Sequence, residues 1–378
     1  MLKVFRHRLY PTAAQRQRLE STLETCRRFY NDCPGERKAA YETEGRTIGK
    51  VEQLRRVKVH KGNNPFATDI HSHILQVVVT DLQKAFDAFF RRIALGETPG
   101  YPRFKGVNRF RSFGLKEYGN GFKIDGRRLK LSGIGRIAVR WHREIEGKIK
   151  TVRICRRAGK WYAAFCCEVE SAPLPSSEQE VGIDAGLSSL FVLSTGEHID
   201  NPRWYRESQR KLRVLQRAAS RKKKGGANRR KAVSTLARFT EHVANQRKDF
   251  LNKLACTLVC CFGRIAVEGL SIGRMAKGHF AKSILDAGWG YFRQRLQSKA
   301  ENAGRTVVLV DPAYTTQDCC QCGHRQKLSL SERWYSCSEC GNSCHRDENA
   351  ARNVLQAGRV CWASTSAMAG VAQEAAGL

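Results

Sequence analysis

The spacing of apolar residues predicts helices in the first quarter of the chain. Residues 1–8 alternate in polarity like a strand, and a helix is expected after Thr12, because Gln15 follows three residues later as in a capping box. A second helix is expected near 74–93, where apolar residues recur at intervals of three and four, as on one buried face. That face consists of Ile74, Val77, Val78, Leu82, Ala85, Phe86, Phe89, Phe90 and Ile93.

The pattern changes to short strands between residues 104 and 169. Apolar residues alternate with Lys and Arg over stretches separated by glycines, which predicts a small antiparallel barrel with one apolar and one basic face. The expected strands lie around 122–124, 129–131, 137–139, 152–154 and 161–169. Aromatic residues are interleaved with the basic ones, and we interpret this as a contact for nucleic acid rather than an ordinary solvated face. These aromatic residues are Phe104, Phe110, Phe113 and Tyr118.

A stretch rich in proline and serine at 171–177 indicates the main domain boundary. Residues 203–231 carry thirteen Lys and Arg against one acid, Glu207, and are expected to form a helical hairpin bent at Gly225-Gly226. Such a density of like charge repels itself, so contact with phosphates is favoured over a bare solvated face. The Ala- and Gly-rich residues after Cys361 are expected to be a loose tail.

Charge and cysteine content narrow the class of partner. The 378 residues hold 67 Lys and Arg against 35 Asp and Glu, a net charge of +32, which points to a polyanion such as nucleic acid. The charged N-terminal residues predict no signal peptide, and no uncharged run approaches a membrane span. The 15 cysteines are therefore expected in a reducing cytoplasm, with the protein at the nucleoid when it is bound to a target.

Three acidic residues stand at the edges of apolar segments. Asp184 follows the strand-like residues 181–183, Glu268 follows 265–267, and Asp347 opens a helical pattern. Cleavage of a phosphodiester by two Mg²⁺ ions needs carboxylates gathered at one point, and an RNase H-like sheet can gather residues this far apart. Taken singly, each acid has another explanation, as a turn former, a strand-end residue or a helix-dipole acid.

A fourth carboxylate competes with these three. Asp311 closes the apolar stretch 307–310, but Pro312 follows it directly. A proline cannot donate a ladder hydrogen bond, so this pair is more typical of a structural exit from a strand.

Four cysteines form two C-x-x-C-G units. Cys319 and Cys322 make the first unit, and Cys337 and Cys340 make the second. Four thiolates complete a tetrahedral Zn²⁺ site and leave no position for water, so we predict one structural zinc ion. Cys320 and Cys344 are spare candidates that belong to neither unit.

These motifs resemble the TnpB family, the RNA-guided nucleases that transposons encode. The resemblance rests on 182–186 (GIDAG), 267–270 (VEGL) and 346–351 (RDENAA), with the cysteine units between the second and third. Further similar segments, including 8–11 (RLYP) and 100–105 (GYPRFK), extend it over nearly the whole chain. One departure is Cys320, because a serine more often follows the first zinc ligand.

The resemblance implies an α/β multidomain fold. Its expected parts are a wedge-like β-barrel (1–10 and 96–172), a helical recognition insert (11–95), a RuvC-like nuclease domain of RNase H type (178–314 and 346–360), a zinc ribbon (315–345) and the loose tail (361–378). It also implies binding of a guide RNA from the transposon end, recognition of a short motif beside the target, and cutting of both DNA strands by one RuvC centre. Type V CRISPR effectors are similar, and in such proteins base pairing reads the target sequence.

The predicted site residues follow from the motifs and the charge. Asp184, Glu268 and Asp347 are expected to be catalytic and to hold two Mg²⁺ ions. Residues expected to contact nucleic acid are Arg103, Lys105, Arg210, Lys211, Arg221, Lys222, Lys223, Lys224, Arg229 and Arg230. The expected partners are guide RNA and double-stranded target DNA, with one protein copy per RNA and no membrane. The competing classes are a nuclease-inactive guided regulator, a strand-joining transposase and, more distantly, a sugar-kinase-like ATPase.

Overall fold

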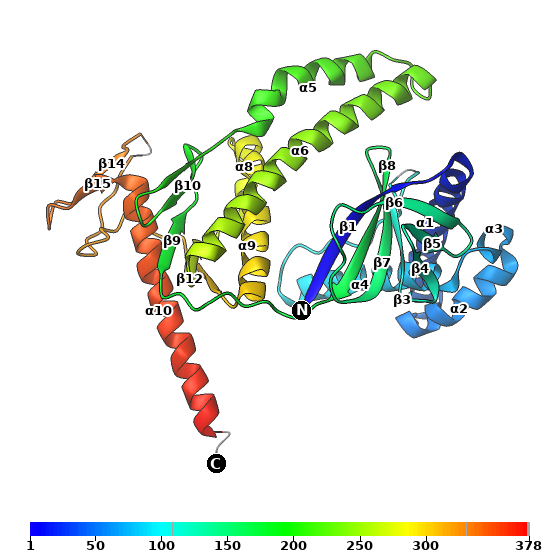
Figure 1. Cartoon of the computed structure of the whole chain (residues 1–378), viewed down its shortest axis with the longest axis horizontal. Coiled ribbons are helices and arrows are strands. Elements are labelled where there is room, and N and C mark those ends of the chain that lie inside the picture. The colour runs from blue at the N-terminus through cyan, green and yellow to red at the C-terminus, as the bar shows by residue number, and fades with distance from the viewer. Residues whose placement is uncertain (108, 330, 376–378) are drawn as a thin grey trace. The chain divides into compact units, whose positions relative to one another are not determined.

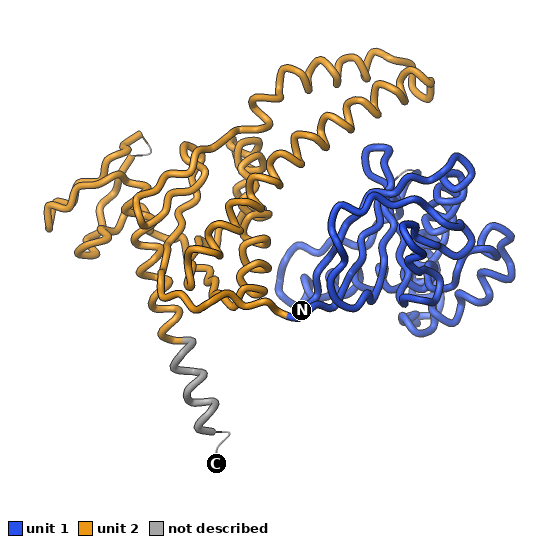
Figure 2. The backbone as a smooth tube through the Cα atoms, in the orientation of Figure 1, with its two compact units in different colours: residues 1–170 blue, residues 171–378 orange. Residues whose placement is uncertain are grey.

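The computed structural model divides the chain into two compact units, Met1–Glu170 and Ser171–Leu378 (Figure 2). It describes residues 1–375 apart from 108 and 330, with side chains described as far as residue 364. Each unit has its own hydrophobic core.

The first unit is built on an eight-stranded sheet with the order β2-β7-β8-β1-β6-β5-β4-β3. Neighbouring strands are antiparallel except β3 and β4, and β3 returns to lie beside β7, so the sheet curls. The predicted strands are confirmed. Their bounds are β1 Leu2–Tyr10, β2 Ser112–Leu115, β3 Glu117–Tyr118, β4 Gly121–Asp125, β5 Arg128–Leu131, β6 Gly135–Arg140, β7 Lys148–Arg157 and β8 Lys160–Glu168.

The helices among the described residues of this unit are α1 (Ala13–Glu44), α2 (Lys50–Asn63), α3 (Pro65–Thr68) and α4 (Ser72–Ala94). Thr12 and Gln15 form the predicted capping box, with the Gln15 amide nitrogen 3.3 Å from the Thr12 hydroxyl that accepts its hydrogen bond. The buried face of α4 was predicted one turn too long, because Phe90 and Ile93 are exposed.

The aromatic residues of the strand region do not form one surface. Phe113 lies on β2, and its side chain is buried in the core of this unit, so its interpretation as a nucleic-acid contact is wrong. Phe110 is half-buried against the same core, whereas Phe104 and Tyr118 are exposed. The alternation along a strand sends neighbouring side chains to opposite faces, and Phe113 points inward.

The second unit contains a five-stranded sheet with the order β11-β10-β9-β12-β13. Figure 1 labels its strands β9, β10 and β12. The strands β9, β12 and β13 are parallel, while β10 and β11 are added antiparallel. The bounds are β9 Glu180–Asp184, β10 Ser189–Leu193, β11 His198–Asp200, β12 Arg264–Glu268 and β13 Thr306–Val310. A separate two-stranded sheet pairs β14 (Trp334–Ser336) with β15 (Ser343–His345).

Alternate residues of β9 and β12 face different helices. Val181, Ile183, Ile265 and Val267 belong to a core shared with α6 (Ala227–Cys261) and α9 (Trp289–Ala303). Ala266 belongs instead to a smaller core with Val354 and Trp362 of α10 (Arg346–Ala375). Because side chains alternate, Gly182, Asp184 and Glu268 lie on the α10 side of the sheet.

Gly182 allows α10 to approach the sheet closely. A Cβ atom built at this position would overlap the Ala351 carbonyl oxygen and the Leu355 backbone. The sequence GID therefore brings the helix that carries Asp347 directly onto the strand that carries Asp184.

The remaining helices are α5 (Trp204–Ser220), α7 (Ile272–Met275) and α8 (Ala281–Ala287). The α5 and α6 helices form the predicted hairpin, with its turn at 221–226, and Figure 1 shows it extending from the sheet. The expected loose tail is helical as far as Ala375, which fits its alanine content, while 376–378 lie outside the described residues. Within the described part of the chain, every helix is too short or too polar to cross a bilayer.

Candidate functional site

The three predicted acids lie at one edge of the five-stranded sheet. Asp184 ends β9 and Glu268 ends β12, and these parallel strands are paired so that Val267 is opposite Ile183. Their carboxyl ends therefore meet at the same edge, on the side that α10 covers. Asp347 lies in the first turn of α10, which packs on both strands.

Burial makes this cluster electrostatically unusual. Asp184, Glu268 and Asp347 are each 7% exposed. Burial and the negative charges of Glu268 and Asp347 raise the pKa of Asp184 well above its ordinary value. Burial also raises the pKa of Glu268 to about 7, although hydrogen bonds from Thr315 and the Ala185 backbone oppose this. Mutual repulsion on this scale is relieved when a cation enters such a site.

Two further side chains contact the acids. The Thr315 hydroxyl donates a hydrogen bond to Glu268 Oε1 at 2.9 Å, and Arg346 Nε lies 3.4 Å from Asp347 Oδ1. Both contacts are shielded from solvent, since Thr315 is buried and the Arg346 side chain is 11% exposed. Sequence reasoning assigned neither residue a role, although Arg346 is the first residue of the RDENAA motif and Thr315 lies four residues before the first paired cysteine.

The competing acid, Asp311, has a different environment from the three buried acids. Asp311 is exposed, and its Oδ1 accepts a hydrogen bond from the Ala313 amide at 3.0 Å. This contact shapes the turn that leaves β13, as Pro312 suggested.

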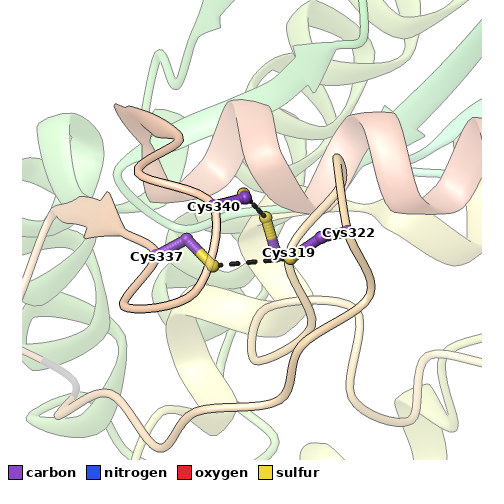
Figure 3. A group of neighbouring side chains, drawn as sticks. All are labelled: Cys319, Cys322, Cys337 and Cys340. Carbon is purple, nitrogen blue, oxygen red and sulfur yellow. Dashed lines mark hydrogen bonds between the residues drawn. The ribbon is translucent and has the colours of Figure 1, made fainter.

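The four cysteines converge as their spacing predicted. The Sγ atoms of Cys319, Cys322, Cys337 and Cys340 all lie within 4.8 Å of one another, which would fit a single metal ion (Figure 3). The pairs Cys319–Cys340 and Cys322–Cys337 are both 3.6 Å apart. Gly323 and Gly341 have positive φ angles of 77° and 70°, so glycine is required to complete each knuckle.

The spare cysteines, Cys320 and Cys344, are linked to this cluster through Asn342. The side-chain amide of Asn342 lies 3.6 Å from the sulfur of Cys319, 3.6 Å from that of Cys320 and 3.9 Å from that of Cys344. Within the described residues, the four paired cysteines are the one group of three or more potential ligands that converges this tightly. The carboxylates interact electrostatically but are less tightly gathered.

The basic residues of the hairpin are mostly exposed at its tip. Arg210, Lys211 and Arg230 are exposed on the helices, and Arg221, Lys222, Lys223 and Lys224 are exposed at the turn. Lys211 lies over the Phe239 ring at 4.7 Å.

Arg229 differs from its neighbours in the basic run. Its Nη1 donates to the carbonyl oxygens of Ala219 and Lys222, both at 3.0 Å, and to that of Ser220 at 3.3 Å. These acceptors end α5 and begin the turn, so the contacts give Arg229 a structural role in closing the hairpin.

The two predicted contacts of the first unit lie on the loop after α4. Arg103 is exposed and, with Phe104 and Tyr101, lines a cavity of about 940 Å³. Lys105 is half-buried: its amide donates to Asn31 Oδ1 at 2.7 Å, and its Nζ lies 5.4 Å from the centre of the Tyr30 ring. Its main chain is thus fixed, and its ammonium group lies over an aromatic ring.

Comparisons with known proteins indicate the family of this chain. Family descriptions match in three places: "Helix-turn-helix domain" over 1–46, "Probable transposase" (OrfB of IS605) over 164–278, and "Cas12f1-like, TNB domain" over 289–354. The chain is 36% identical over 366 residues to a Streptomyces pristinaespiralis protein named "Putative RNA-guided DNA endonuclease", covering 94% of this chain and 89% of that protein. The chain belongs to the TnpB family.

Other similarities agree with membership of the TnpB family. A protein of Escherichia coli K12 named "Putative RNA-guided DNA endonuclease InsQ" is 31% identical over 384 residues, which cover 96% of this chain and 94% of InsQ. A Cas12f1 chain from a cryo-EM structure with sgRNA and target DNA matches with a TM-score of 0.59 at 12% identity, covering 94% of this chain and 98% of that one. The last similarity establishes a shared mixed α/β fold.

Proposed function

We propose that this TnpB-family protein is an RNA-guided DNA endonuclease encoded by an insertion sequence. The observation that carries the proposal is the meeting of Asp184, Glu268 and Asp347, all buried, at one edge of a sheet. The relatives named as RNA-guided DNA endonucleases span nearly the whole chain, which supports the same activity here.

The three carboxylates are proposed to hold two Mg²⁺ ions. Their oxygens are the hard ligands that Mg²⁺ prefers, and their buried, mutually repelling charges suit cation binding. When bound, the ions would activate a water molecule and stabilise the leaving oxygen of a phosphodiester. The chain itself orients the carboxylates, through the two strand ends, the first turn of α10 and the hydrogen bond from Thr315.

The four cysteines are proposed to hold one structural Zn²⁺ ion. A set of four thiolates gives a closed tetrahedral site, and both knuckles have the glycine that their turns require. In this role the metal stabilises residues 315–345 and takes no part in the reaction.

The strand order supports a RuvC-like nuclease domain of RNase H type over 178–314 and 346–360. An antiparallel meander of β9, β10 and β11 is extended by two parallel strands beside β9. The curled sheet of the first unit is proposed as the wedge-like barrel (1–10 and 96–172), and α1 to α4 as the recognition insert (11–95).

The basic hairpin and the loop after α4 are proposed to hold guide RNA and duplex target DNA, with one protein copy per RNA. The residues proposed for this contact are Arg103, Lys105, Arg210, Lys211, Arg221, Lys222, Lys223, Lys224 and Arg230. Their charges would displace counterions from phosphates, so binding should weaken as salt rises. Arg229 is proposed to support the hairpin instead.

The test compares the wild-type complex with two acidic variants. Each is purified with its co-expressed guide RNA and incubated with supercoiled target plasmid and Mg²⁺. Asp184→Ala should keep the RNA and cut at least about a hundredfold more slowly. The matched control Asp311→Ala removes a nearby exposed carboxylate and should cut like the wild type. Wild-type protein that shifts the plasmid without cutting it would indicate a guided regulator, and joined transposon ends would indicate a transposase.

A further inference from the structure

Thr315 holds one carboxylate of the cluster in place. Its hydroxyl oxygen lies 2.9 Å from Glu268 Oε1 and 3.2 Å from the carbonyl oxygen of Pro312, and the residue is 7% exposed. A hydroxyl has one proton to donate. The ionised carboxylate is the stronger acceptor, so the bond to Glu268 is favoured over the bond to Pro312.

The segment that carries Thr315 is clamped by α10. The Asn353 side-chain amide donates to the carbonyl oxygens of Thr315 at 2.8 Å and Asp318 at 2.6 Å. Asn349 also donates to Asp318 O, at 2.7 Å, and it accepts from the Cys320 amide at 2.9 Å. The same helix carries Asp347, so α10 positions one acid directly and a second through this segment.

The bend just before Thr315 is held against a backbone cost. Tyr314 has a φ angle of 63°, in the left-handed region where a side chain is disfavoured. Such conformations persist where surrounding contacts determine them, and they concentrate at functional sites. Here the two hydrogen bonds from Asn353 hold the main chain just after the bend, where the Thr315 hydroxyl bonds Glu268.

The chemistry of a hydroxyl suits this position. It orients a carboxylate by donating a proton, yet it adds no positive charge, so the oxygens keep their charge for a cation. Asp347 contrasts with this, because the neighbouring Arg346 guanidinium offsets its charge.

We propose that Thr315 is a positioning residue that orients Glu268 for divalent-cation binding. This inference rests on the proposed function, because it assumes that the carboxylates bind the reactive ions. It adds a residue from outside the acidic cluster to the machinery of cleavage.

Three substitutions separate the hydroxyl from the shape of the side chain. Thr315→Val keeps the branched shape and removes the donor, whereas Thr315→Ser keeps the donor and removes a methyl group. Thr316→Val is the matched control, because Thr316 is the exposed neighbour of Thr315. Circular dichroism and thermal unfolding establish that each full-length variant folds.

The first measurement is Mn²⁺ binding to the full chain without RNA, from the loss of the free-ion EPR signal. Asp184→Ala defines the signal that comes from the carboxylates. Thr315→Val should weaken that binding roughly tenfold to a hundredfold. Thr315→Ser should restore it to within a fewfold of wild type, and Thr316→Val should leave it unchanged.

The second measurement is the Mg²⁺ concentration that gives half-maximal plasmid cleavage. For Thr315→Val it should rise by a similar factor, and cleavage should recover at high Mg²⁺. Wild-type Mn²⁺ affinity in Thr315→Val, or equal losses in the valine and serine variants, would overturn the inference, as would wild-type binding that does not depend on Asp184. If the Mn²⁺ results hold but wild-type protein never cuts, the positioning role stands and the endonuclease proposal fails.

Discussion

The cysteine cluster and the carboxylate cluster lie in the same unit but are assembled in opposite ways. The cysteines come from one short segment, 319–340, and their sulfur atoms gather through two local knuckles. The carboxylates come from residues as far apart as Asp184 and Asp347, and two strands and a helix must pack before they meet. The first is a site that a metal can help to fold, and the second is a site that the fold must build against repulsion.

The largest expected effect comes from opening the cysteine cluster. Replacing Cys322 and Cys340 together by Ser should abolish zinc binding, which contributes about 10 kcal/mol or more in small zinc domains. Elemental analysis should then find no zinc, and amides in 315–345 should lose protection from hydrogen exchange. The Mn²⁺ affinity of the carboxylates should also fall, because Thr315 lies in this segment.

A matched pair of thiols tests whether the effect is local. Cys256 and Cys260 are exposed on α6, one helical turn apart. Their joint replacement by Ser should leave the zinc content at one ion per chain. Equal zinc loss in both double variants would argue against a site made by the four paired cysteines.

The carboxylate cluster should make the metal-free protein less stable as pH rises. A carboxylate in a salt bridge would have the opposite effect, because its pKa is lowered on folding. The pKa of Glu268 is raised by burial to about 7, so the folded metal-free protein binds its proton more tightly than the unfolded chain does. The stabilisation is complete below the ordinary pKa of 4.5 and is lost as pH rises through about 7, a change on the order of a few kcal/mol. Thermal unfolding without metal should therefore show falling stability between about pH 5 and pH 8.

Addition of Mg²⁺ and the uncharged variant Glu268→Gln test whether the carboxylates cause this pH dependence of stability. Mg²⁺ binds the ionised carboxylates, so it should raise the unfolding temperature at pH 8 and have little effect at pH 5. Glu268→Gln should flatten the pH dependence of the metal-free protein and remove most of the Mg²⁺ effect. A wild-type protein whose stability rises over this pH range would contradict the assigned direction of the pKa shift.

A smaller effect is expected where α10 meets β9. Gly182→Val should cost about 1–3 kcal/mol, because its side chain would overlap the helix backbone at Ala351 and Leu355. Cleavage should fall with stability, since the helix that carries Asp347 must move outward. Gly273→Ala is the control, because a Cβ atom there has open space around it. Denaturant unfolding and plasmid cleavage measure both consequences.

The smallest effect is expected at the hairpin tip. Arg229→Ala should destabilise the end of α5 by about 1 kcal/mol, because three carbonyl oxygens lose a charged donor. Arg230→Ala, one position on, should leave that turn unchanged and weaken RNA binding more. Hydrogen exchange in the last turn of α5 and filter binding at two salt concentrations distinguish the two residues.

Much of the site could be predicted from sequence because its signals are local. The C-x-x-C-G spacing predicts the cysteine cluster without knowledge of the fold. Asp184 and Glu268 each end an apolar strand, and the strand periodicity places both on one face of the sheet. What brings Asp347 to them is Gly182, whose missing side chain lets the helix approach, and the acids alone do not predict that contact.

Other features had no local signal. Thr315 is one of two adjacent threonines, and only the path of the chain directs it toward Glu268. Arg229 belongs to a run of similar charges, and its role depends on where α5 ends. The α4 stripe continues to Phe90 and Ile93 in sequence, but these two side chains remain exposed where the packed face ends.

The α10 helix performs two tasks whose relative rotation about the helix axis is set by their spacing in the sequence. Asp347 lies in its first turn, and Asn349, Asn353 and Gln356, spaced by four and three residues, reach the segment 315–320. Inserting one residue between Asp347 and Asn349 would rotate one set against the other by about 100°. Homologous chains should therefore tolerate changes in the length of the zinc-ribbon loops while keeping the spacing from this acid to its asparagines fixed.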